Sequence, residues 1–267
     1  MTLRNKPSNM RTISFVKMHG IGNDFVLIDN RYTDIKLSTD DIIYMGNRHT
    51  GIGFDQLLFL SQSDIADCDA AYQFFNPDGT QAEQCGNGQR CLSLYLHQQN
   101  PHKTSFKLSG LAGIVSSEIL TNMQVRVNMG PMKSYHVKEA NNQKCYELDF
   151  GNPHLVTCVD DVDGCDLESM NKEYTGQYSK GINFEVVQVV STQEIRIRVH
   201  ERGTGETLAC GSGACAAAFA LMQTGDLTSK VKVVLSGGKL MVEYNLEENE
   251  IYLTGPAQSV FTGEIIL

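Results

Sequence analysis

The chain has 267 residues, of which 41% are hydrophobic and 20% charged, which suffices for one large soluble domain or two of ordinary size. A net charge of −9 argues against a broad surface for nucleic acid or acidic membranes. The longest apolar run, residues 214–222, is far shorter than the roughly 18 residues of a membrane span.

The eight cysteines include no Cys-x-x-Cys pair, so we do not expect a structural zinc site. The polar N-terminal stretch, residues 1–11, is followed by no apolar segment of the signal-peptide type. We therefore interpret it as a frayed extension of a cytoplasmic protein whose thiols stay reduced.

Strands dominate the predicted secondary structure, because short β-branched or alternating runs recur along the whole chain. A Ser-Gly-Gly turn at 236–238 predicts a hairpin between two of them. The expected strands cover residues 13–16, 25–28, 125–128, 145–150, 155–159, 184–190, 194–199, 231–235, 240–244 and 251–253.

Four helices are expected. The Ser38-Thr39-Asp40-Asp41 cap opens the first, which runs toward Arg48, and residues 167–177 form a polar candidate. Residues 86–98 and 211–222 form the other two, and the latter is apolar almost all round, as in a helix buried within sheets. Each half of the chain therefore combines several strands with one central helix. We predict an α+β fold with two similar lobes and a boundary near residues 130–131.

The two central helices begin at a repeated Cys-Gly-polar-Gly motif, with Cys85 and Cys210 in the lead positions, 125 residues apart. At a helix N-terminus the free N–H groups and the dipole favour an anion, and glycines let a carboxylate approach the backbone. The same dipole lowers a thiol pKa, so one thiolate and one thiol are expected to coexist at neutral pH. Such a pair can invert a carbon centre, with one group removing a proton and the other delivering one.

A simpler interpretation makes both cysteines small apolar core residues, as free cysteines often are. Two matched motifs opening two helices favour the chemical interpretation. Arg202 is a candidate for bidentate carboxylate binding, although a surface ion pair is the alternative. Asn-containing turns elsewhere can bind an amino acid or simply shape the loops.

Five motifs in this order resemble the diaminopimelate epimerase family: KMHGIGNDF, GIGFDQLL, FFNPDGTQAEQCGNGQRC, GNPH and ERGTGETLACGSGACA. The resemblance covers nearly the whole chain from about Ile13. It implies two pseudosymmetric lobes, each a sheet or barrel around a central helix, with the site between them. The first lobe is then residues 1–129 plus a returning 255–267, and the second is 130–254.

The resemblance further implies interconversion of LL- and meso-2,6-diaminopimelate for lysine and peptidoglycan precursors, with no pyridoxal phosphate, no metal, and a homodimer. It implies that Cys85 and Cys210 are the acid/base thiols and that His154 and Glu201 tune them. The implied substrate-binding residues are Asn23, Gln56, Asn76, Gly86, Asn87, Asn152, Asn183, Glu201, Arg202, Gly211 and Ser212. The chain departs from the family pattern at Pro77, Gln89, His200 and Phe261, and the last of these bears on dimer contacts.

Three other functions would use parts of the same pattern. Proline racemases share the paired thiols, but a prolyl substrate has no evident use for the Asn and Arg residues. Phenazine-type isomerases share the fold and lack the cysteine pair. A non-enzymatic thiol switch would need Cys85 and Cys210 to form a reversible disulfide, with Cα atoms within about 7 Å.

Overall fold

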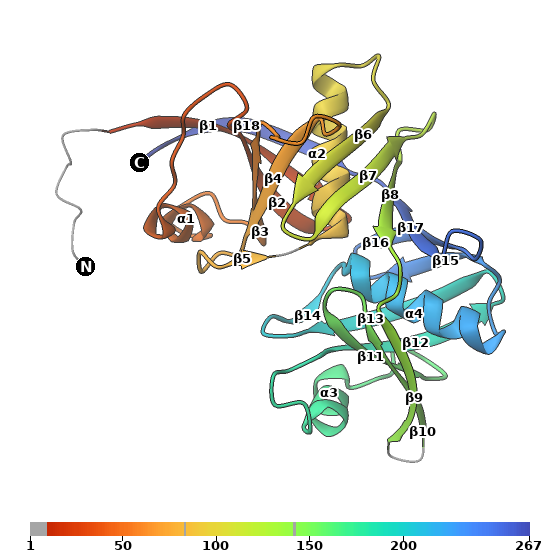
Figure 1. Ribbon diagram of the computed structural model, residues 1–267. Coiled ribbons are helices and arrows are strands. Elements are labelled where there is room, and N and C mark those ends of the chain that lie inside the picture. Colours follow the sequence, from red (N-terminus) through yellow and green to blue (C-terminus); the bar gives the residue numbers. More distant parts are fainter. Residues whose placement is uncertain (1–9, 83, 141–142) are drawn as a thin grey trace.

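The structure is a computed structural model that describes residues 10–82, 84–140 and 143–267 (Figure 1). The N-terminal extension expected to be frayed lies almost entirely outside these residues. The described residues form a continuous mixed sheet and four helices. The helices are α1 (Thr39–Gly46), α2 (Gly86–Gln99), α3 (Leu167–Thr175) and α4 (Gly211–Thr224).

Figure 1 shows two bodies, each with one helix surrounded by strands. In the first, helix α2 contacts strands from both ends of the chain, because the last strand pairs with the first. The strands of this body are β1 (Thr12–Gly20), β2 (Asn23–Asp29), β3 (Gln56–Ser61), β4 (Ala70–Phe75), β5 (Gln81–Ala82), β6 (Ser105–Gly110), β7 (Gly113–Ile119), β8 (Val125–Gly130) and β18 (Gln258–Ile266).

In the second body, helix α4 is surrounded in the same way, and its alanines from Ala214 to Ala220 are fully buried. Strand β17 pairs with β8, which makes the sheet continuous between the two bodies. The strands are β9 (Ser134–Ala140), β10 (Gln143–Asp149), β11 (Pro153–Cys158), β12 (Asn183–Ser191), β13 (Glu194–Glu201), β14 (Gly205–Thr207), β15 (Lys230–Leu235), β16 (Gly238–Asn245) and β17 (Glu250–Gly255).

Strand pairing repeats between the two bodies. Strands β2 and β3 are parallel and joined through α1, and β11 and β12 are parallel and joined through α3. Within these pairs Phe25 lies opposite Gln56, and His154 lies opposite Asn183. This register places Asn23 and Asn152 at equivalent positions, each two residues before the paired residue. Leu58 and Glu185 are also at equivalent positions, because Leu58 lies two residues after Gln56 and Glu185 lies two residues after Asn183.

The predicted α+β fold with two lobes is confirmed. All four predicted helices are present, with ends within three residues of those expected, and each predicted strand range falls on a strand. The hairpin at 236–238 is also present, because β15 pairs with β16 directly across it. Strands absent from the predicted list include β4, β6, β7 and β18, whose residues are partly exposed and mixed in polarity.

Candidate active site

The two motif cysteines occupy the same structural position in the two bodies. Cys85 is the N-cap of α2 and Cys210 is the N-cap of α4, both with extended backbone. Each sulfur accepts a hydrogen bond from the backbone N–H three residues on, at 3.4 Å from Gly88 and from Gly213. A thiol in place of the usual hydroxyl or carboxylate therefore uses one of the free N–H groups of each helix.

The N-termini of the two helices meet. The buried Asn87 side chain in the first turn of α2 donates to the carbonyl of Ala209, directly before Cys210, at 3.2 Å. The same Asn87 amide also donates to Asn23 Oδ1 at 3.2 Å. A methyl group added at Gly211 would lie 3.4 Å from Asn87 Oδ1, so the first turns of both helices are in close contact. This contact brings the two cysteine motifs into one site.

Burial is the main cause of the shifted pKa values of the two thiols in the ligand-free chain. Burial raises the pKa of Cys85 to about 11, and the N–H of Gly88 offsets only part of this. Burial, with the nearby Glu201 carboxylate, raises the pKa of Cys210 well above its ordinary value. The expectation of a thiolate at neutral pH is therefore wrong for the ligand-free chain, because desolvation of the charged form outweighs the helix N-terminus.

Glu201 acts on both thiols, since its negative charge raises the pKa of Cys85 and of Cys210. Burial in turn raises the pKa of Glu201, while hydrogen bonds with Thr207 and with Cys210 act against that rise. Glu201 thus lies where a proton could pass between a carboxylate and a thiol.

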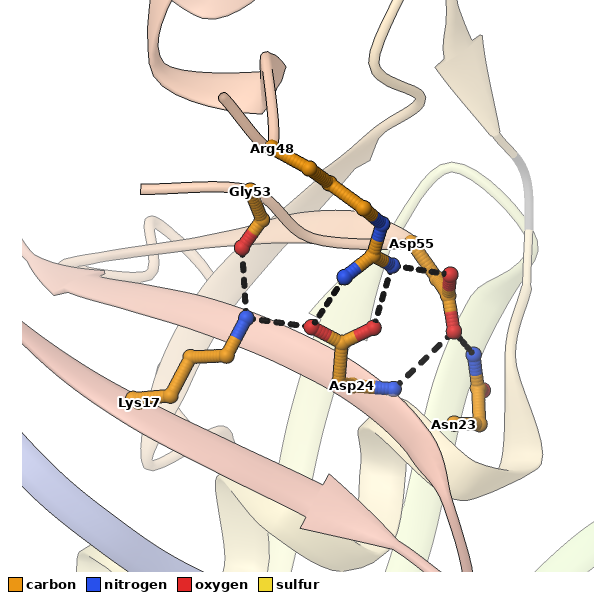
Figure 2. Close-up of polar contacts among 6 residues, drawn as sticks. All are labelled: Lys17, Asn23, Asp24, Arg48, Gly53 and Asp55. Atoms are coloured by element: carbon orange, nitrogen blue, oxygen red, sulfur yellow. Dashed lines mark hydrogen bonds and ion pairs between the residues drawn. The ribbon is translucent and has the colours of Figure 1, made fainter. Parts of the chain in front are cut away.

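In the first body, Asn23 lies beside Cys85, with its Oδ1 3.7 Å from the sulfur. Figure 2 shows how Asn23 is held: Asp55 accepts from its amide at 2.9 Å and from the backbone N–H of Asp24 at 3.0 Å. Arg48 joins both carboxylates, at 2.6 Å from Asp24 and 2.7 Å from Asp55. Two carboxylates sharing one guanidinium fix the β2 end of the site.

Lys17 completes this network from β1, through an ion pair with Asp24 and a hydrogen bond to the carbonyl of Gly53 (Figure 2). Gln56, at the start of β3, donates to Asn76 Oδ1 at 3.3 Å. The Oε1 atom of Gln56 is buried and has no hydrogen-bond partner among the described residues. It is therefore free to accept a hydrogen bond from a ligand.

In the second body, polar side chains form a chain of contacts that ends at Cys210. Ser212 Oγ lies 3.6 Å from the sulfur, and Asn152 donates to Ser212 Oγ at 3.2 Å. His154 Nε2 lies 3.0 Å from Asn152 Oδ1, and its Nδ1 lies 2.7 Å from Glu185 Oε1. His154 and Glu185 are both completely buried.

Asn183 is buried at the start of β12, and Arg202 is exposed directly after the end of β13. The Asn183 amide donates to the carbonyl of Pro153 at 3.1 Å and accepts from the backbone N–H of Arg202 at 2.9 Å. Both ends of the Asn183 side chain therefore hold backbone, and this positions Arg202. Arg202 is exposed, and within the described ranges its guanidinium forms no ion pair, which leaves it available to an anionic ligand.

The sequence motifs did not identify several residues of this site, among them Arg48, Asp55 and Glu185. Asp55 directly precedes Gln56 in the GIGFDQLL motif. A charged residue inside this glycine-containing motif was a signal that could have identified it as a site residue. Glu185 interrupts the apolar run of β12, where every neighbour from Asn183 to Val187 is also buried. A carboxylate in such a strand indicates a buried partner, because an isolated buried charge is very costly.

The described part of the chain contains no group of three or more His, Cys, Asp or Glu side chains placed to hold a metal ion. Within the same residues, no helix is long and apolar enough to cross a membrane. The surface hollow lined by Ser191, Gln193 and Lys232 shares no residue with the paired-cysteine site.

The fold and the site together define a class, namely two-lobed α+β proteins whose central helices bring their N-termini to a common site. Solved structures support the fold: a Bacillus anthracis phenazine biosynthesis protein of the PhzF family matches with a TM-score of 0.75 at 14% identity, covering 96% of this chain and 100% of that one. A hydroxyproline epimerase from Agrobacterium vitis matches with a TM-score of 0.68 at 12% identity, covering 96% and 92%.

Sequence comparison identifies one family within this class. The family described as diaminopimelate epimerase matches residues 15–135 and 146–260. The diaminopimelate epimerase of Acinetobacter baylyi is 41% identical over 275 residues, covering 96% of this chain and 98% of that protein. The enzyme of the same name from Nitrosospira multiformis is 39% identical, covering 96% and 99%. The chain belongs to the diaminopimelate epimerase family, as the sequence motifs predicted.

Proposed function

We propose that this enzyme interconverts LL- and meso-2,6-diaminopimelate through Cys85 and Cys210, without an organic cofactor. The observation that carries the proposal is the contact between the two helix N-termini, each capped by a cysteine and joined by the Asn87–Ala209 hydrogen bond. The family match and the names of the relatives support the substrate.

In the proposed reaction, one sulfur is a thiolate that takes the α-proton, so a C–H bond breaks and an S–H bond forms. The electron pair left on the carbon is taken up by the adjacent carboxylate. The opposite thiol then gives its proton to the other face of the carbon and becomes the thiolate. The two cysteines exchange protonation states, and the configuration at that carbon is inverted.

The substrate itself helps to form the thiolate. Both thiols are protonated in the ligand-free chain at neutral pH, because burial raises their pKa values. A bound α-ammonium group brings a positive charge, which favours the charged form of a nearby thiol. The first-turn N–H groups of Gly86, Asn87, Gly211 and Ser212 have no partner within their helices and suit the α-carboxylate, whose charge grows as the proton leaves.

The remaining predicted contacts divide between the lobes. We propose that Asn23, Gln56 and Asn76 bind substrate from the first lobe, and Asn152, Asn183, Glu201 and Arg202 from the second. Arg202 suits the distal carboxylate, because its guanidinium has no ion-pair partner among the described residues and can bind a carboxylate with two hydrogen bonds. His154 and Glu201 tune the thiols.

The lobe limits remain part of the proposal, with residues 1–129 and 255–267 in one lobe and 130–254 in the other. We also propose that the enzyme acts in lysine biosynthesis in the cytoplasm, where its eight free cysteines stay reduced. A homodimer through the first lobe is supported by Val260 and Phe261 of β18, which are half exposed. Light scattering of the purified enzyme measures that assembly directly.

The test is exchange of the substrate α-proton in deuterated water, followed by mass spectrometry and chiral analysis. The wild-type chain should convert each isomer into the other and place deuterium on the product carbon. Cys85→Ser and Cys210→Ser should each reduce epimerisation by at least about a hundredfold, because an alcohol is a far weaker acid and base at this pH. Wild-type epimerisation by either variant would exclude the two-thiol mechanism. Racemisation of proline without turnover of diaminopimelate would assign the paired thiols to a different substrate.

A further inference from the structure

Arg90, on the second turn of helix α2, is a completely buried arginine with no carboxylate partner in the described part of the chain. Its Nε atom donates to the carbonyl of Pro256 at 3.1 Å, and its Nη1 atom lies 3.5 Å from the carbonyl of Gly86. Its Nη2 atom is buried and has no hydrogen-bond partner among the same residues. A guanidinium stays protonated in proteins, so this side chain is a buried positive charge to which the proposed reaction assigns no role.

The guanidinium lies against the first turn of α2, in the Cys85 half of the site. Long side chains on a helix point back toward its N-terminus, and Nη1 of Arg90 accordingly reaches Gly86, the residue after Cys85. A methyl group added at Gly20, at the end of β1, would lie 2.9 Å from Nη2 and 3.4 Å from Cβ of Asn87. The Nη2 atom without a partner therefore lies beside the turn that follows Cys85.

A buried charge is costly unless an opposite charge or several hydrogen bonds offset the loss of water. Burial accordingly lowers the pKa of Arg90. Three thiols act against that fall, those of Cys91, Cys85 and Cys215. Cys91 and Cys215 are completely buried, whereas Cys85 is partly exposed at the start of the helix. Among the three, Cys85 is therefore the thiol that a substrate or a reagent can reach.

The second lobe has a different residue at the equivalent position. Arg90 follows Cys85 by five residues, and the residue that follows Cys210 by five is the buried Cys215. The strands behind each helix differ as well, because a methyl group at Gly88 would meet Leu58 and Phe74, whereas one at Gly213 would meet Glu185. A cation on the helix itself is thus a feature of the first lobe.

The charges around the two thiols act in different directions. Burial raises the pKa of both thiols. At Cys85 the carboxylate of Glu201 raises the pKa further, and the guanidinium of Arg90 lowers it. At Cys210 the carboxylates of Glu201 and Glu185 both raise it. The thiolate form is therefore less disfavoured at Cys85 than at Cys210.

We propose that Arg90 is a positioning residue for the Cys85 half of the site, and that its guanidinium is the buried counter-charge for negative charge at the start of helix α2. When Cys85 is a thiolate, the cation and the anion lie in the same interior, and each offsets the cost of burying the other. As pH rises in the ligand-free chain, Cys85 then ionises before Cys210. This inference rests on the proposed function for its meaning in catalysis, since it names the thiol at which the thiolate first forms.

The first experiment measures alkylation of each cysteine by iodoacetamide, an uncharged reagent, with peptide mass spectrometry of the full-length ligand-free chain from about pH 8 to 11. In the wild-type chain, the rate of Cys85 should level off at a lower pH than that of Cys210. The phenol of Tyr72, which also lies near Cys85, stays largely neutral in this range because burial raises its pKa to about 12. The reverse order of the two cysteines would overturn the proposal without any substitution.

The same assay is then applied to Arg90→Gln, which removes the charge and keeps an N–H donor. It should slow Cys85 about threefold for each tenfold loss of thiolate, because a more basic thiolate is also a better nucleophile. Cys210 is the internal reference and should not change. Gly255→Ala crowds the segment that Arg90 holds and leaves the charge in place, so it is the matched control and should leave Cys85 within twofold of wild type.

Three results of these substitutions would contradict a counter-charge. They are an unchanged or faster Cys85 in Arg90→Gln, equal slowing of Cys85 and Cys210, and equal slowing of Cys85 by Gly255→Ala. The last two would assign Arg90 to packing alone, because a packing role does not depend on charge and does not distinguish the two thiols.

A second experiment fixes the negative charge at the start of the helix. Cys85→Asp places a carboxylate at the N-cap, a position that suits aspartate. Arg90→Met should then lower the urea midpoint more in the Cys85→Asp background than in the wild-type background, because the carboxylate loses its counter-charge. Additive effects of the two substitutions would overturn the proposal.

None of these measurements needs a substrate, so they separate the role of Arg90 from the proposed function. Absence of diaminopimelate turnover, with the effects on Cys85 intact, would refute the function and leave the role of Arg90 standing. Turnover of diaminopimelate, with no effect of Arg90 on Cys85, would refute the role of Arg90 and leave the function standing.

Discussion

Asn87 of helix α2 donates a hydrogen bond across the lobe boundary to the carbonyl of Ala209, the residue before Cys210. The same amide nitrogen donates to Asn23 Oδ1, so one buried side chain connects both cysteine motifs and the start of β2. A buried amide that joins three segments in this way fixes the separation of the two thiols.

Replacing Asn87 with alanine should destabilise the chain by about 1–3 kcal/mol, because a buried carbonyl loses its donor. Activity should fall mainly in kcat, since the two thiols would no longer be held opposite each other. Urea denaturation and steady-state kinetics measure the two effects. Asn100→Ala, which removes the exposed C-cap residue of the same helix, is the matched control. Equal effects of the two substitutions would exclude a special role for Asn87.

Substitution by alanine should destabilise the chain more at Gly213 than at Gly88. At Gly213 the added methyl group would lie 2.7 Å from the carboxylate of Glu185, which is held by His154. At Gly88 the nearest atoms are 3.2 Å away on Leu58 and Phe74, which can shift slightly. We expect Gly213→Ala to cost about 1–3 kcal/mol of stability and Gly88→Ala to cost less, since alanine also favours the helix. Thermal denaturation of both variants gives the comparison, and a greater loss at Gly88 would contradict it.

The network in Figure 2 should affect substrate binding more than turnover. Asp55→Asn weakens the hold on Asn23 and the ion pair with Arg48, while leaving the thiols in place. We expect KM to rise about tenfold, the size of one lost charge-assisted hydrogen bond, with a smaller change in kcat. Arg31→Met removes another Arg–Asp pair of the same lobe, with Asp29, and should leave KM unchanged. A loss of kcat alone in Asp55→Asn would assign the network to the chemical step.

The raised pKa of Cys85 should make the chain less stable in alkali. Burial raises the folded-state pKa of Cys85 to about 11 from an ordinary value of 9.0. Between these values the unfolded chain releases the thiol proton and the folded chain keeps it, so stability is present below pH 9 and is lost as pH rises toward 11. Urea denaturation from pH 8 to 11 should therefore show a decline that is shallower in Cys85→Ala. A parallel decline in both proteins would show that other groups cause it.

Much of the fold and of the candidate site could be predicted from the sequence alone. The four helices, ten of the strands and the two-lobed α+β class followed from local periodicity, caps and glycine turns, which act over a few residues. The paired thiols followed from a motif that occurs twice, because a helix N-terminus is defined locally. The family followed from ordered motifs over nearly the whole chain.

Only the tertiary structure decided how the thiols are tuned. The sequence places Cys85 and Cys210 at positive helix ends, but their pKa values rise because burial depends on everything packed around them. Glu185 and Leu58 look unrelated in the sequence, and only strand register shows that they occupy equivalent places. The sequence determined two similar half-sites by local rules, and the packing of distant strands made one of them ionic and the other apolar.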